Sequence, residues 1–174
     1  MRVALIGAGQ IARQHLSCLK TLAGVQIAGV CDLSPAVAES IAERYGVPAW
    51  FTDHAAMLRD VRPDIVHVTT PPTSHFRLAM DALQSGAHVL VEKPATATLA
   101  ELEQLVRYAL ERQLVLTEDY NYVFNHAARA IAGWVESGML GPVVHVEVTM
   151  SLNLFGPVGF ADPNARHPAL ALAG

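Results

Sequence analysis

The residues with the clearest chemical potential stand in the segment 90–96, LVEKPAT, where an apolar run ends in Glu92, Lys93 and Pro94. Charge is costly to bury, and proline donates no hydrogen bond to a sheet. One interpretation is that the strand has reached the surface and its last residues are only solvated. The other is that the strand delivers Lys93 to a site, where a partly buried lysine can transfer a proton or orient a hydroxyl group and Glu92 can position it.

A glycine-rich segment, IGAGQIA, follows the first apolar run and opens a helical pattern. Gly7 and Gly9 stand at G-x-G, and Ala12 takes the third position of the pattern G-x-G-x-x-G/A. Gly7 permits a tight turn, Gly9 lets the backbone approach a pyrophosphate, and Ala12 allows close helix packing. Such glycines also occur for steric reasons alone, but the position directly after a strand favours a dinucleotide site at Gly7, Gly9, Gln10 and Ile11.

Asp32 supports the same interpretation. It ends the second apolar run, 20 residues after Ala12, where an acid can bind the ribose hydroxyls of adenosine. The alternative is that Asp32 caps the next helix, but Ser34 followed by Pro35 already explains that helix start. A carboxylate at this place disfavours a 2′-phosphate, so NAD is the expected cofactor rather than NADP.

A rigid turn follows the next core strand in the segment HVTTPPTSH. The turn is formed by Thr69, Thr70, Pro71 and Pro72. It is expected at the carboxyl edge of the sheet, where open α/β sheets bind ligands. For Thr70 and His75 a ligand contact and a purely structural role both stay open, whereas Ser74 is interpreted as structural.

The elements that must position these residues alternate regularly. The apolar runs RVALIG, VQIAGVC, DIVHVTT, AHVLVE and LVLTE are apolar at nearly every position, as strands buried on both faces are, and PAWF is a weaker candidate. Helical patterns lie between them. Thr52 is the expected N-cap of the short helix in TDHAAMLRD, and Thr73 or Ser74 is the expected N-cap of the helix in PPTSHFRLAMDALQSG. The last has an apolar stripe at Leu99, Leu102, Leu105 or Val106, and Leu110. This alternation predicts an α/β fold with a doubly wound parallel sheet.

The pattern changes after Tyr122. The segment NHAARAIAGWVESG predicts one more helix, and Val143–Leu152 then alternates apolar and polar residues with period 2. A strand with one buried face is typical of an antiparallel sheet. We therefore expect a first domain over residues 1–121 and the beginning of a second, incomplete domain over residues 122–174.

Composition narrows the classes of function. The 174 residues are 52% hydrophobic and 16% charged with a net charge of −4, which gives no indication of a nucleic-acid or membrane surface. MRVALIGAG is too short an apolar run for a signal peptide, and Cys18 and Cys31 are interpreted as reduced core thiols, so a cytoplasmic protein is expected. Trp50, Trp134 and the methionines are assigned to the core. The histidines, including His15, His67, His88 and His145, show no ligand spacing, so no metal site is expected.

Together, IGAGQIA, CDLSP, TTPPTSH, VEKPAT and SGMLGPVVHVEV resemble the glucose-fructose oxidoreductase/inositol dehydrogenase (Gfo/Idh/MocA) family over residues 1 to about 152. The resemblance implies a Rossmann domain followed by an α/β domain with a large, mostly antiparallel sheet that binds substrate and pairs subunits into a homo-oligomer. It implies NAD(P)-dependent oxidation of a carbinol of a sugar, polyol or related compound. Lys93 inherits the catalytic role of the lysine in the E-K-P motif, and Glu92, Lys93 and Pro94 border the nicotinamide.

The chain departs from the family pattern in two places. Residues 123–126 read Val-Phe-Asn-His, where the family often has Arg-Phe and then Pro. The Asp and His that complete proton transfer in the family, and most of the substrate pocket, belong to the second domain beyond the residues of this chain. We therefore expect the 174 residues to be inactive alone, and a non-catalytic dinucleotide-binding module is the alternative.

Overall fold

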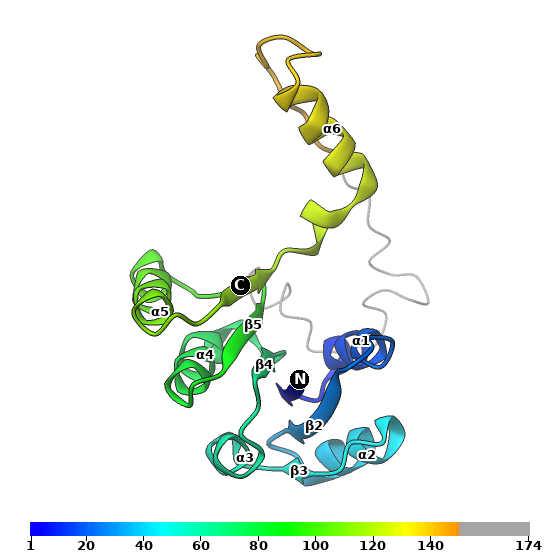
Figure 1. Cartoon of the computed structure of the whole chain (residues 1–174), viewed down its shortest axis with the longest axis vertical. Coiled ribbons are helices and arrows are strands. Elements are labelled where there is room, and N and C mark those ends of the chain that lie inside the picture. Colours follow the sequence, from blue (N-terminus) through cyan, green and yellow to red (C-terminus); the bar gives the residue numbers. More distant parts are fainter. Residues whose placement is uncertain (150–174) are drawn as a thin grey trace, which may run out of the picture. The chain divides into compact units, whose positions relative to one another are not determined.

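A computed structural model describes residues 1–149 of the chain. It divides into two compact units, Met1–Asp119 and a second that starts at Tyr120. The first unit holds a six-stranded, all-parallel sheet with strand order β3-β2-β1-β4-β5-β6 (Figure 1). The strands are β1 (Arg2–Ile6), β2 (Gln26–Cys31), β3 (Trp50–Phe51), β4 (Ile65–Val68), β5 (His88–Glu92) and β6 (Leu116–Asp119). The expected doubly wound parallel sheet is thereby confirmed, including the weak strand at PAWF.

Helices cover both faces of this sheet. They are α1 (Gln10–Leu19), α2 (Pro35–Tyr45), α3 (His54–Val61), α4 (His75–Gln84) and α5 (Leu99–Glu111). Figure 1 shows α1 and α2 on one side and α3, α4 and α5 on the other. Alternate residues of β1 separate accordingly, since Val3 and Leu5 belong to the core under α1 and α2, whereas Ala4 and Ile6 belong to the larger core on the other face. This period-2 alternation explains why the central strands are apolar at every position.

Of the expected helix caps, the one at Ser34 is confirmed, whereas Ser74 precedes α4 without a side-chain cap hydrogen bond. The Ser34 hydroxyl caps α2 by accepting from Val37 N, Pro35 is its first residue, and Gly46 ends it with φ 65°. A capping box of Thr98 and Glu101 begins α5. The expected cap of α3 is wrong, because the Asp53 carboxylate, not Thr52, accepts from Ala55 N at 3.0 Å. An aspartate one residue closer to the helix takes the position that bonds to the second helical N–H.

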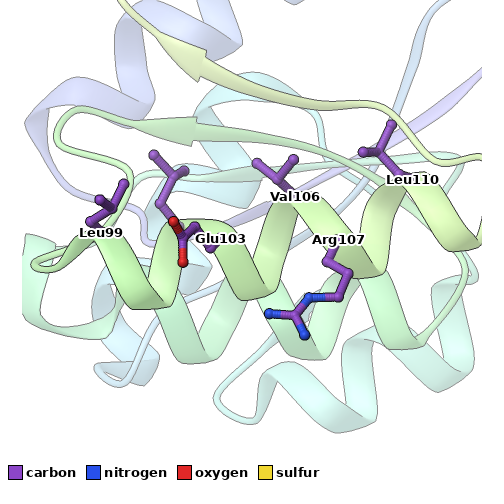
Figure 2. A pocket seen from close by; sticks show the side chains of 6 residues that line it. Leu99, Glu103, Val106, Arg107 and Leu110 are labelled. Atoms are coloured by element: carbon purple, nitrogen blue, oxygen red, sulfur yellow. The ribbon is translucent and has the colours of Figure 1, made fainter.

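The apolar stripe expected on α5 is divided between core and surface. Leu105 and Ala109 are buried against the sheet, whereas Leu99 and Leu110 are 70% and 73% exposed. Leu99, Val106 and Leu110 lie along one side of the helix, where with Leu102, Glu103 and Arg107 they line an open, largely apolar groove (Figure 2). The helical period predicts which residues of α5 form the apolar stripe, but it does not predict how many of them are buried. The sheet covers only the residues near Leu105.

Several residues assigned to the core lie elsewhere. Trp50 is 41% exposed because it stands on the two-residue edge strand β3, and Trp134 is also exposed. Of the two cysteines, Cys31 is buried but Cys18 is exposed on the outer side of α1. Burial, aided by Asp32 and Asp53, raises the pKa of the Cys31 thiol to about 11, so this thiol is an unreactive core residue.

The second unit contains a 3-10 turn at Asn121–Phe124 and the helix α6 (His126–Glu136), as the sequence predicts for this region. The expected strand over Val143–Leu152 is absent in its described part, because residues 143–149 pair with no other strand there. The rest of that segment lies outside the described residues. Within residues 1–149 no helix has the length and apolar character needed to cross a membrane.

Candidate active site

Four strand ends meet at one edge of the sheet. Ile6 of β1 is in register with Cys31 of β2 and with Val68 of β4, and Val68 is in register with Val91 of β5. The residues that follow these positions therefore lie at the same level along the carboxyl edge. The strand order reverses between β1 and β4, which is the place where open parallel sheets bind ligands.

The glycine-rich loop has the conformation that the motif requires. Gly7 has φ +98°, and a Cβ added to it would lie 2.7 Å from the Thr69 carbonyl oxygen, so no other residue fits there. At Gly9 an added Cβ would meet nothing within 4 Å, so the backbone faces open space. Gly9 precedes α1 without a side-chain cap, which leaves the first N–H groups of α1 to an outside acceptor such as a phosphate.

Asp32 connects the end of β2 to this loop. Its Oδ2 accepts from Ala8 N at 2.9 Å, and its Oδ1 accepts from Ser34 N at 2.9 Å. The side chain is half-buried, and each carboxylate oxygen keeps a further lone pair. It therefore holds the loop and can still accept hydrogen bonds from a ribose.

The turn after β4 shows different roles for its residues. The Thr69 side chain is buried, and its hydroxyl lies 2.7 Å from the Gly7 carbonyl oxygen, to which it donates. Thr70 is half-buried and its hydroxyl accepts from the Ser74 hydroxyl at 2.8 Å. Pro71 is exposed and Pro72 half-buried. Thr69 thus supports the glycine loop from behind, while Thr70, Pro71 and Pro72 are accessible to a ligand.

Lys93 stands exposed immediately after β5, and its segment is firmly held. Glu92 is buried, and its Oε2 accepts from the backbone N–H of Lys93 at 3.2 Å. The Glu118 carboxylate accepts from Ala95 N at 2.9 Å, and Pro94 between them is exposed. Lys93 is therefore an exposed amine on a fixed backbone at the carboxyl edge.

A buried polar cluster that the sequence patterns did not predict begins at His15. This histidine lies on the sheet-facing side of α1; its Nε2 is 3.1 Å from Glu92 Oε1 and 3.4 Å from Asp119 Oδ2. Its Nδ1 is 3.0 Å from Nδ1 of His67 on β4. A signal was present, because Ala12, His15, Leu16 and Leu19 form the buried stripe of α1 with helical spacing.

The cluster sets the charges near Lys93. Burial raises the pKa of Glu92, but the hydrogen bond and charge of His15, with the N–H and ammonium of Lys93, outweigh it and hold that pKa below its usual value. Burial and His15 lower the pKa of His67 to about 4, so His67 is neutral at pH 7. Glu92 is therefore ionised beneath Lys93.

The same cluster bears on the metal prediction. Within residues 1–149, His15, Glu92 and Asp119 are the residues whose ligand atoms lie within 4.8 Å of one another. The His15 ring already hydrogen-bonds at both nitrogens, to His67 and to Glu92. These contacts account for the cluster without an ion, and the absence of a metal stays a prediction.

A glycine turn that leaves the first N–H groups of α1 free, an acid at the end of β2 and a lysine at the end of β5 are the arrangement of a dinucleotide-binding protein with a Rossmann fold. Residues 1–120 match the model of the oxidoreductase family with an NAD-binding Rossmann fold. The chain belongs to this family, Gfo/Idh/MocA, and its cofactor is NAD.

Similar proteins act on sugars and nucleotide sugars. The chain is 33% identical over 161 residues to D-glucoside 3-dehydrogenase of Escherichia coli, covering 92% of this chain and 46% of that protein. It is 39% identical over 116 residues to UDP-N-acetylglucosamine 3-dehydrogenase of Acidithiobacillus ferrooxidans, covering 67% of this chain and 36% of that protein. The WlbA dehydrogenase of Chromobacterium violaceum, solved with NADH and UDP-GlcNAcA, superposes with a TM-score of 0.77 at 27% identity, covering 81% of this chain and 41% of that one. The chain thus spans less than half the length of these relatives.

Proposed function

We propose that this chain is the cofactor-binding part of an oxidoreductase that transfers a hydride between NAD and a carbinol carbon of a sugar, polyol or related compound. The observation that carries the proposal is the position of Lys93, exposed at the end of β5 on the edge that also holds the glycine loop and Asp32. In the sheet, β4 lies directly beside β5, and β1, which leads into the glycine loop, lies on the other side of β4.

Each part of the edge has a distinct role in this proposal. Gly9 and the N-terminus of α1, with Gln10 and Ile11, hold the pyrophosphate, and Asp32 accepts the ribose hydroxyls of the adenosine. Thr70, Pro71 and Pro72 border the nicotinamide side. NAD, when bound, supplies the hydride acceptor.

Lys93 acts at the substrate hydroxyl. Its neutral amine would take the hydroxyl proton and become an ammonium as the carbinol carbon gives up its hydride, and the ammonium would then donate a hydrogen bond to the carbonyl oxygen of the product. Glu92 holds the Lys93 backbone through the N–H at 3.2 Å and contributes a negative charge beneath it. The substrate pocket and the subunit contacts belong to the second domain, so residues 1–174 alone bind NAD without turnover.

The test combines binding and turnover. Calorimetry on the 174-residue chain measures NADH affinity, and absorbance at the NADH band measures turnover by the complete gene product with sugars, polyols and nucleotide sugars. Lys93→Ala lowers turnover about 10²-fold or more and changes NADH affinity much less. Lys93→Arg is the matched control, because it keeps the positive charge but does not release a proton. Full turnover in Lys93→Ala would contradict the role of Lys93.

The second candidate is a dinucleotide-binding module without catalysis, since the glycine loop and Asp32 can hold a dinucleotide without a substrate pocket. It predicts NADH binding by the chain and no turnover of any compound by the complete gene product. The two candidates separate in the turnover assay, whereas both require NADH to bind.

A further inference from the structure

His75 occupies an unusual position between the two ligand-facing segments. It is the first residue of α4, its side chain is 0% exposed, and it therefore cannot contact a cofactor as a surface ligand would. Its Nε2 lies 2.7 Å from the carbonyl oxygen of Thr70, in the turn after β4. Its Nδ1 lies 2.8 Å from the carbonyl oxygen of Pro94, in the segment after β5. One ring thus spans the turn that borders the nicotinamide and the segment that carries Lys93.

The acceptors on the two sides restrict the hydrogen bonds of this ring. A carbonyl oxygen only accepts hydrogen bonds, and a neutral imidazole has one N–H. A neutral ring therefore donates to one of the two carbonyl oxygens, at 2.7 or 2.8 Å, while its other nitrogen lies against the second carbonyl oxygen. Either tautomer keeps the ring between the two segments.

We propose that His75 is a positioning residue that fixes the nicotinamide-side turn and the Lys93 segment relative to each other. This inference rests on the proposed function for the meaning of the two segments, but not for the contacts of the ring. The neighbouring bonds do not join the two segments: the Ser74 hydroxyl donates to Thr70 Oγ1 within the turn, and the Glu118 carboxylate of β6 accepts from Ala95 N in the Lys93 segment. His75 adds the tie between the segments, so that a shift of one is transmitted to the other.

The contacts of the ring are tested directly. Nuclear magnetic resonance of the uniformly ¹⁵N-labelled 174-residue chain at pH 7 observes the ring N–H protons of the histidines and their exchange with water. The ring N–H of His75 is expected to exchange slowly, because it is buried and hydrogen-bonded to a carbonyl oxygen. Exchange as fast as that of an exposed histidine overturns the proposal. This measurement needs neither cofactor nor substrate, so it stands whether or not the proposed function is correct.

Two variants separate the two ties. His75→Gln places an amide near Nε2 and can keep the bond to Thr70, whereas His75→Asn places one near Nδ1 and can keep the bond to Pro94. We expect NADH affinity to fall at least fivefold in His75→Asn and to stay within twofold of wild type in His75→Gln. The acylation rate of Lys93, measured by mass spectrometry without NADH, is expected to change at least threefold in His75→Gln and less than twofold in His75→Asn.

The control is His54→Gln, which removes the histidine at the first position of α3, a residue that bonds to Asp81 of α4 and to neither segment. It should leave NADH affinity and the Lys93 rate unchanged. If both His75 variants fold, lower the melting temperature and leave NADH affinity and the Lys93 rate at wild-type values, His75 is a structural residue only and the positioning role is wrong. If NADH binds to no form, the proposed function fails, while the exchange of the ring N–H and the Lys93 rates still decide the role of His75.

Discussion

His67 makes the stability of the chain depend on pH between its lowered pKa and the pKa of a free histidine. The folded chain holds its pKa at about 4, compared with 6.5 for a free histidine, because the ring is buried and faces His15. Between these values the unfolded chain binds a proton at His67 that the folded chain does not, so the free energy of unfolding rises with pH. The contribution is complete above 6.5 and is lost as the pH falls towards 4.

The magnitude follows from the two pKa values. At pH 5 an unfolded histidine is almost fully protonated, while His67 in the folded chain is mostly neutral. The free energy of unfolding is therefore about 2 kcal/mol lower at pH 5 than at pH 7. Glu92 does not change the free energy of unfolding in this pH range. Its lowered pKa stabilises the fold fully above the ordinary value of 4.5, and this stabilisation is lost only below that pH. The window between pH 5 and pH 7 therefore reports mainly on His67.

The assay is urea denaturation followed by circular dichroism at pH 7, 6 and 5, on the wild-type chain and on His67→Asn, which cannot titrate. The wild type should lose about 2 kcal/mol more than the variant between pH 7 and pH 5. Nuclear magnetic resonance titration of His67 should place its midpoint near 4. The burial argument would be refuted if the free energy of unfolding changed equally with pH in the two proteins, or if His67 titrated with a midpoint near 6.5.

Three further predictions concern the cofactor site and the fold. Asp32 should favour NADH over NADPH by about 1.4 kcal/mol, or tenfold, and calorimetry on Asp32→Ala should show equal affinities; a preference that survives the change would assign discrimination to other residues. Gly7→Ala should destabilise the chain by about 3 kcal/mol because of its positive φ and the contact with Thr69, whereas Gly9→Ala should leave thermal stability unchanged and weaken NADH at least about tenfold. Loss of stability in Gly9→Ala would show that its open space is filled by protein. Thr98→Ala should remove the capping box of α5 and cost about 1 kcal/mol in urea denaturation, with Thr52→Ala, an exposed threonine that does not cap α3, as the unchanged control.

The features that could be predicted from the sequence depend on local rules. The parallel strands were recognisable because strands covered on both faces are apolar at every position. The glycine loop was recognisable because Gly7 needs a positive φ and Gly9 needs an open backbone, and both needs act within a few residues. Helix starts at Ser34 and Thr98 follow from side chains that bond to the next turn.

The features that could not be predicted depend on distant partners. His15 and Glu92 are 77 residues apart, and only the packing of α1 on the ends of β5 and β6 brings them together. His75 has the sequence context of a ligand residue, but the Pro94 carbonyl oxygen, 19 residues further on, turns its ring inward. Leu99 and Leu110 follow the helical period as well as Leu105 does, yet the sheet does not extend beneath them.

The central position of β1 in the sheet has a consequence for the order of folding. The first strand of the chain pairs with β2, which follows closely, and with β4, which arrives only after two more helices and a short strand. Contacts between residues far apart in sequence form late, because a long loop must close first. The half of the sheet that carries Asp32 can assemble during early synthesis, whereas the Thr69 hydroxyl reaches Gly7 across 62 residues. A refolding chain should therefore regain helical signal before it regains affinity for NADH, and the delay between the two signals measures the closure of β1 against β4.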